Sequence, residues 1–205
     1  RLLGLEAFGL YALGWNLLRS IGILLPLGLQ NGVLHFGARY WRQDDGALRS
    51  ILVRTIAMSF LIGCGVTLIL FIAAPWLMVN VFNEPGFITP FRVFTLMLPF
   101  MGTLRVAANA TRISQRMQYS VAAEEIAQST LNILLFALFY LLGWELMGAV
   151  VSTVLSYIAA LGVALYFVRR LFREAFQAPS RSAVTPRQMV AFSAPTSLAD
   201  ISGVI

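Results

Sequence analysis

The sequence predicts an all-α polytopic membrane protein, a bundle of transmembrane helices. Of its 205 residues, 59% are hydrophobic, against about 45–50% in soluble domains. Only 12% are charged, about half the usual share, and the mean hydropathy is +0.78. A soluble domain needs more polar surface than this. Apolar runs of roughly 20 residues, the length that crosses the bilayer core, alternate with short charged loops.

The first complete span is expected from Phe8 to Leu34. Gly22, Pro26 and Gly28 favour a kink or local unwinding in its second half, because proline removes a backbone donor and membrane helices tolerate such breaks. A charged loop is expected next, at residues 40–50.

Four more segments complete the expected order. They are residues 55–83, 91–110, 125–142 and 146–168. A polar, arginine-rich linker follows at residues 169–187, and another helix begins at residue 188. The chain starts without Met and stops inside an apolar segment, so we expect a fragment of a longer membrane protein.

The charges and the scarcity of metal ligands limit the possible functions. The net charge is +6, and every basic residue is arginine. A nucleic-acid binder would also be basic, but here the arginines lie between apolar runs, so membrane topology explains them better. Cys64 is the only cysteine, which excludes a C-x-x-C site. His35 is the only histidine, which disfavours a zinc site built from histidines. No catalytic or nucleotide-binding motif is present, so no catalytic residue, metal or cofactor is predicted.

The arginines predict an orientation. Two arginines, Arg1 and Arg92, fall on one side of the alternating loops. The positive-inside rule makes the other side cytoplasmic, with loops 36–54, 111–119 and 169–187. That side carries Arg39, Arg42, Arg49, Arg54, Arg105, Arg112, Arg116, Arg169, Arg170, Arg173, Arg181 and Arg187.

Arg19 lies near the middle of the first span. Asn16, Arg19, Ile23, Pro26 and Gln30 follow at spacings of three and four, so one continuous helix would place them on one face. A central arginine costs at least ~2.5 kcal/mol to insert. It is therefore expected to contact an anionic substrate in a water-filled cavity, or else to pair with an acid or reach the interface as a structural residue.

A second polar stripe contains Arg105, Asn109, Arg112 and Arg116 at helical spacing. Arg105 is a candidate cavity residue. The other two arginines are better explained as interfacial residues at the cytoplasmic end.

A third stripe contains Glu125, Gln128, Ser129 and Asn132, with Glu124 beside it. A solvated helix start explains the two glutamates, because acids are favourable at a helix N-terminus. It does not explain Asn132, which is a candidate substrate-binding residue.

Asp200 shares a face of the last helix with Ser193 and Ser197. It is the candidate site for a coupling ion, H+ or Na+, or a partner for an arginine such as Arg19. The two serines and Pro195 could equally mark a simple helix kink.

Two sequence segments near the N-terminus are RLLGLEAFGLYALGW and LPLGLQNGVLHFGARYW. They resemble the polysaccharide-exporter branch of the multidrug/oligosaccharidyl-lipid/polysaccharide exporter superfamily. His35 stands where that branch often has arginine. The matching positions are Arg1, Leu3, Gly4, Phe8, Gly9, Tyr11, Leu27, Gly28, Leu29, Gly32 and Val33.

The resemblance implies 12–14 helices in two lobes around a cationic cavity, with alternating access driven by a cation gradient or the membrane potential. Residues 1–168 would be most of the first lobe, residues 169–187 a cytoplasmic linker, and residues 188–205 the start of the second lobe. The protein would be a multi-pass protein of the bacterial inner membrane.

The leading hypothesis is therefore a flippase for a lipid-linked oligosaccharide or polysaccharide precursor, with no nucleic-acid partner. Its candidate substrate contacts are Arg19, Asn16, Gln30, Arg105 and Asn132. A cation-coupled multidrug exporter of the same fold is the first alternative. A membrane-embedded glycan polymerase or glycosyltransferase is the second, although the sequence shows neither catalytic acids nor a sizeable outer loop.

Overall fold

The computed structural model describes residues 5–25, 28–114 and 117–179. These residues form helices joined by short turns, with no strand among them. Four helical stretches in this part of the chain are long and apolar enough to cross a membrane: Asp45–Val81, Pro85–Arg112, Gln118–Leu141 and Glu145–Leu171. The predicted fold class, an all-α polytopic bundle, is confirmed.

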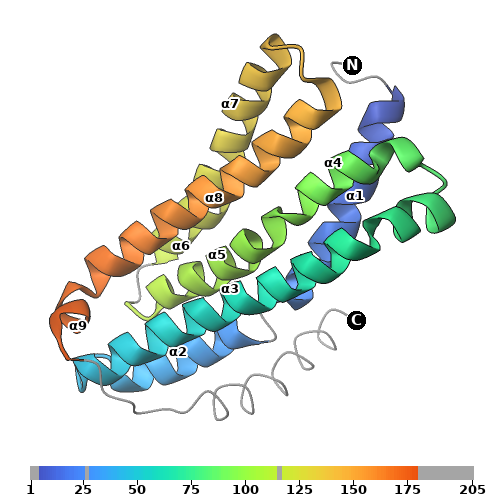
Figure 1. Cartoon of the computed structure of the whole chain (residues 1–205). Helices are drawn as coiled ribbons and strands as arrows, with labels where there is room; N and C mark the ends of the chain where they lie inside the picture. Colours follow the sequence, from blue (N-terminus) through green and yellow to red (C-terminus); the bar gives the residue numbers. More distant parts are fainter. Residues whose placement is uncertain (1–4, 26–27, 115–116, 180–205) are drawn as a thin grey trace, which may run out of the picture.

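The helices follow one another as long antiparallel rods (Figure 1). Their bounds are α1 Leu5–Leu24, α2 Leu29–Tyr40, α3 Asp45–Trp76, η1 Leu77–Val81, η2 Pro85–Phe87, α4 Ile88–Thr95, α5 Met97–Arg112, α6 Met117–Val121, η3 Ala122–Ala127, α7 Gln128–Leu141, α8 Glu145–Leu171 and α9 Arg173–Gln177. η1 and η3 are π-helical turns inside longer helical stretches, and η2 is a 3-10 turn.

The first predicted span is not one helix. α1 ends at Leu24, and α2 begins after Gly28, which adopts a left-handed conformation with φ 74°. Glycine takes this conformation without the steric cost that a Cβ would add. The predicted unwinding is therefore confirmed, but the single face that joined Asn16 and Arg19 to Gln30 is wrong, because Gln30 lies on α2.

The charged loop expected at residues 40–50 is shorter than predicted. α3 already begins at Asp45, because the side chain of Asp44 accepts a hydrogen bond of 3.0 Å from the backbone N–H of Ala47. A side-chain acceptor at this position satisfies one of the unpaired N–H groups of the first turn. α8 likewise runs on to Leu171, and α9 occupies part of the predicted linker.

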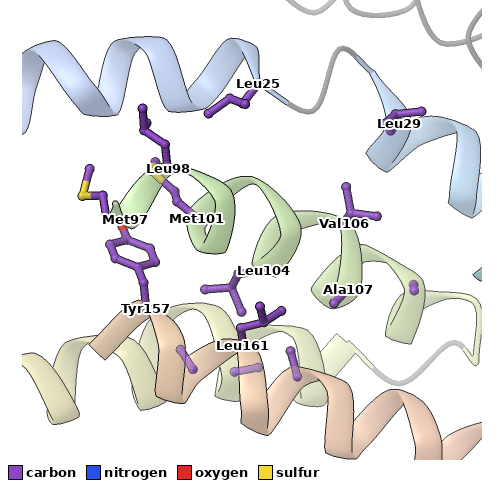
Figure 2. Close-up of a cluster of buried hydrophobic side chains, with 14 of the residues drawn as sticks. Leu25, Leu29, Met97, Leu98, Met101, Leu104, Val106, Ala107, Tyr157 and Leu161 are labelled. Atoms are coloured by element: carbon purple, nitrogen blue, oxygen red, sulfur yellow. The ribbon is translucent and has the colours of Figure 1, made fainter. Parts of the chain in front are cut away.

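α5 is the centre of the bundle. It packs against α3 on one side and α8 on another, and it also contacts α1 and α2. Figure 2 shows Leu98 and Met101 of α5 facing Leu25 at the end of α1, while Tyr157 and Leu161 approach from α8. Nearly all of α5 is buried, so this helix supplies the core around which the other helices are arranged.

Apolar side chains also cover much of the outside. Leu61, Leu68 and Ile69 of α3 are more than 60% exposed, as are Ile133 and Leu134 of α7. A surface of this kind would be an aggregation hazard in water and is suited to lipid contact. The protein is a membrane protein.

One end of the bundle is strongly basic. The α2–α3 turn and α9 meet there, where Arg49 Nη1 donates a hydrogen bond of 2.9 Å to the carbonyl of Ala178. We call this the basic end, and Figure 1 shows it beside α9. The turn at residues 142–144 and the segment around η2 lie at the opposite end, near Glu145 and Glu84. The described arginines at the basic end are Arg39, Arg42, Arg49, Arg54, Arg112, Arg169, Arg170 and Arg173.

Candidate functional site: a polar groove between α1 and α7

A pocket of about 230 Å³ lies between α1, α7 and α8. Phe8 and Tyr11 of α1 line one side of this pocket; the remaining lining residues are Asn132, Ile133 and Phe136 of α7 and Ala149 and Ser152 of α8. We call this pocket and the polar side chains that continue from it toward the basic end the polar groove.

Hydrogen bonds join the polar side chains of α7 to hydroxyls of α8. Ser152 Oγ donates to Asn132 Oδ1 at 3.2 Å, and Gln128 Nε2 donates to Ser156 Oγ at 3.4 Å. Polar groups inside a membrane need internal partners, and hydroxyl–amide pairs between helices supply them. These contacts hold α7 beside α8 in register.

Tyr11 connects α1 to the same polar cluster. Its hydroxyl lies 2.9 Å from Thr153 Oγ1, and it also forms a side-chain hydrogen bond with Asn132. The Tyr11 ring stacks on Phe94 with ring centroids 5.4 Å apart. The hydroxyl is therefore fixed at the junction of α1, α7 and α8.

Arg105 of α5 and Glu124 form an ion pair. Arg105 Nε lies 3.9 Å from Glu124 Oε1, and both side chains are about one-quarter exposed. Glu124 belongs to the π-helical turn η3, and Arg112 also interacts with it electrostatically. π-Turns inside helices occur frequently at functional sites. The pair is long for a salt bridge, and neither side chain is fully buried.

This position of Glu124 corrects a prediction. The sequence predicts a helix that starts near residue 125, with Glu124 and Glu125 in solvent at its first turn. The helical stretch instead begins at Met117, so both glutamates lie inside this stretch. Glu125 is exposed, whereas Glu124 reaches Arg105.

Tyr157 of α8 faces α1. Its ring lies 6.3 Å from that of Trp15, one turn before Arg19, and Arg19 itself is exposed. The two predicted cavity arginines come from different helices, Arg19 from α1 and Arg105 from α5, and both helices pack against α8.

The other predicted site residues have different positions. Asn16 is exposed, and its amide donates to the carbonyl of Ala12 at 2.9 Å. Gln30 is partly buried on α2, beyond the break at Gly28. Asn109 Nδ2 donates to the carbonyl of Arg105 at 3.0 Å. Asp200, with its companions Ser193 and Ser197, lies outside the described residues.

Sequence reasoning missed five residues of the groove, although a usable signal existed for two of them. Asn132 and Ser152 are equidistant in sequence from residue 142, as are Gln128 and Ser156. Because residues 142–144 form a tight turn, equal distances predict facing positions in the antiparallel pair. The missed residues are Tyr11, Glu124, Ser152, Ser156 and Tyr157.

In the described part of the chain, no group of three or more His, Cys, Asp or Glu residues is placed so that it could hold a metal ion. The described side chains near the pocket include a guanidinium paired with a carboxylate, as well as amides and hydroxyls. Such a set of side chains can bind a ligand that carries both an anionic group and many hydroxyl groups.

Comparison with known proteins agrees with this chemistry. The search of curated proteins and the search of solved structures found no match. A family model described as polysaccharide biosynthesis protein matches residues 1–205, and the resemblance to the polysaccharide exporter superfamily is confirmed. Its members are generally transporters rather than enzymes. Since the match covers the whole sequence, this chain belongs to the polysaccharide biosynthesis protein family and has a role in polysaccharide export.

Proposed function

We propose that this protein moves a lipid-linked oligosaccharide or polysaccharide precursor from the cytoplasmic to the outer leaflet of the bacterial inner membrane by alternating access. Family membership supports the export role. The polar groove supports the substrate class. The basic end would be cytoplasmic, as the positive-inside rule predicts.

The observation that carries the proposal is the cluster of polar side chains on α5, η3, α7 and α8, in which Arg105 pairs with Glu124 and Asn132 bonds Ser152. Guanidinium groups bind phosphate and carboxylate oxygens through paired hydrogen bonds. Besides the Arg105–Glu124 pair, Arg112 acts electrostatically on Glu124 and Arg19 is exposed on α1, so further guanidinium groups are available to an anion. A pyrophosphate or an acidic sugar is the anion that suits these groups.

The remaining groove residues suit the other parts of such a molecule. The amides of Asn132 and Gln128 and the hydroxyl of Tyr11 can exchange their internal hydrogen bonds for sugar hydroxyls. The pocket beside them is lined by Phe8, Ile133 and Phe136, which can accommodate the start of a lipid chain. The rest of the lipid would remain in the bilayer.

A cation-coupled multidrug exporter is the second candidate, and Glu124 is the observation that favours it. A cavity for cationic drugs needs an acid, and Glu124 supplies one inside a membrane-spanning helix. Two arginines act against it, because Arg105 and Arg112 both interact electrostatically with this acid. Glu124 joins Asp200 as a candidate for coupling to H+ or Na+.

Replacement of Arg19 tests the proposal. Arg19→Ala should abolish complementation of a flippase-deficient strain while the protein still reaches the membrane in normal amount. Arg19→Lys should restore only part of the activity, because lysine keeps the charge but not the paired donors. Arg39→Ala, an exposed arginine of α2 at the basic end, is the control and should complement fully.

Loss of the Arg19→Ala protein from the membrane would instead assign Arg19 a structural role. Full complementation by Arg19→Ala would remove it from the substrate site. Drug resistance conferred by the wild-type protein, without glycan transport, would favour the exporter.

A further inference from the structure

A second pocket lies at the basic end, away from the polar groove. It has a volume of about 340 Å³, within the range of about 300–1,000 Å³ typical of small-molecule sites. We call it the basic pocket. Its lining residues come from the α2–α3 turn, the α5–α6 connection, α6 and the end of α8: Trp41, Arg42, Ser114, Tyr119, Phe167, Arg170 and Leu171.

The arginine of the turn is held in an unusual conformation. Arg42 has φ 64°, a left-handed value that non-glycine residues adopt rarely. Its guanidinium lies over the Trp41 ring, 4.7 Å from the ring centroid, in cation–π geometry. The turn therefore presents a cation and an aromatic ring together at the mouth of the pocket.

Aromatic rings also define the side of the pocket made by α6 and α8. The Tyr119 and Phe167 rings lie 5.0 Å apart, and Arg170 follows one turn after Phe167, in the last turn of α8. Because α8 is a membrane-spanning helix, its last turn lies near the membrane surface, where aromatic residues are enriched and lipid headgroups are found.

The lining combines two arginines with two hydroxyl-bearing side chains and contains no acid among the described residues. An adjacent pocket of about 610 Å³ shares Arg42 and Arg170 but adds Asp45 and Glu174 beside Arg173. The charge there is partly cancelled, so the basic pocket is the one suited to an anion.

We propose that the basic pocket binds the phosphate group of an anionic membrane lipid. Two arginines can share the phosphate oxygens, and the Tyr119 hydroxyl supplies a further donor. The Ser114 hydroxyl donates to the carbonyl of Thr111 at 2.7 Å and would have to rotate to reach a ligand. Basic pockets between membrane helices on the cytoplasmic side recognise such headgroups. The site uses none of the groove residues, so it does not depend on the proposed transport activity.

The test measures lipid binding to the purified full-length protein by native mass spectrometry. Phosphatidylglycerol should bind at least tenfold more tightly than phosphatidylcholine with the same acyl chains. Arg42→Asn combined with Arg170→Gln should lower phosphatidylglycerol affinity at least tenfold. Asparagine tolerates the left-handed backbone at position 42. Arg39→Gln removes a charge at the same end but outside the pocket, and it should change affinity less than twofold.

A competition arm separates the two sources of phosphate chemistry. If millimolar inorganic phosphate displaces phosphatidylglycerol, the pocket recognises the phosphate group alone. If it does not, the pocket requires the lipid as a whole. Either result supports the proposal in its respective form.

Two single variants keep the test decisive if the double variant fails to fold. Arg170→Gln changes an exposed helical position and should cost about fivefold in affinity. Tyr119→Phe keeps the ring beside Phe167 while removing the hydroxyl, and it should cost about threefold. Equal binding of the two lipids, or pocket variants that lose no more than Arg39→Gln, would overturn the proposal.

Discussion

α5 and α7 both belong to membrane-spanning stretches, but they are held in different ways. Most of α5 is buried, including residues such as Leu98, Met101 and Leu104. α7 has no buried residue and contacts its neighbour α8 through hydroxyl–amide pairs. The difference separates two tasks. The α3–α5 side is the tightly packed part of the bundle, and the α7–α8 side carries the polar side chains that we propose contact the substrate.

The largest expected effect is a loss of glycan transport when a residue of the polar groove is replaced. Arg105→Ala should reduce glycan transport at least tenfold and change the thermal unfolding temperature by no more than a few degrees, because the Arg105–Glu124 pair is long and partly exposed. Transport is measured by export of labelled glycan and stability by thermal unfolding in detergent.

Arg39→Ala is the control, since Arg39 is an exposed arginine of α2 at the basic end, outside the polar groove. It should retain most of the transport activity. An Arg105→Ala protein that loses stability and transport together would contradict the division between the two sides.

The next effect concerns stability on the α3–α5 side. A Cβ added at Gly63 would lie 2.5 Å from the Pro99 Cα, a backbone atom that cannot move aside easily. Gly63→Ala should therefore lower the free energy of unfolding by ~1–3 kcal/mol, the usual cost of overpacking.

Gly65→Ala serves as its control two residues later in α3. Nothing lies within 4 Å of a Cβ placed there, and alanine is a better helix former than glycine by about 0.5–1 kcal/mol. This variant should be neutral or slightly stabilised. Equal destabilisation by both substitutions would show that the close contact of α3 with α5 does not limit stability.

The smallest expected effect is the coupling between Asn132 and Ser152. A double-mutant cycle with Asn132→Leu and Ser152→Ala should give a coupling energy of about 0.6 kcal/mol, the average for hydrogen bonds between membrane helices. The single proton of the Ser152 hydroxyl has a second acceptor, the carbonyl of Ala149 at 2.9 Å, so the hydroxyl keeps a partner after Asn132→Leu. A coupling energy well above 2 kcal/mol would show that this hydrogen bond mainly stabilises the fold and is not readily exchanged for a bond to a sugar hydroxyl.

Much of the architecture could be predicted from hydropathy. Long charge-free runs such as residues 55–83 identify membrane helices directly, and the Gly/Pro pattern located the break near Gly28. The bounds differed where a local contact decided them. Asp44 starts α3 earlier than the charge pattern indicated, because its carboxylate caps the helix.

The groove could be predicted only in part, because it depends on which helices become neighbours. Periodicity singles out Arg19, Arg105 and Asn132 as polar residues in apolar helices, and their role as substrate contacts stays a prediction. It wrongly extended the Arg19 face to Gln30, since it assumed a continuous helix. Glu124 was missed because its importance comes from Arg105, a residue on a different helix.

The central claim is that the polar groove binds the lipid-linked glycan. It is tested most directly by a photo-crosslinking amino acid placed at Ile133, beside the groove pocket, and at Ile69, on the outer face of α3. Both side chains are well exposed, so their labelling differs only through what lies against them. In cells that make the glycan, we expect a glycan-bearing adduct at position 133 and none at position 69. Equal adducts at both positions, or adducts at position 69 alone, would contradict the claim.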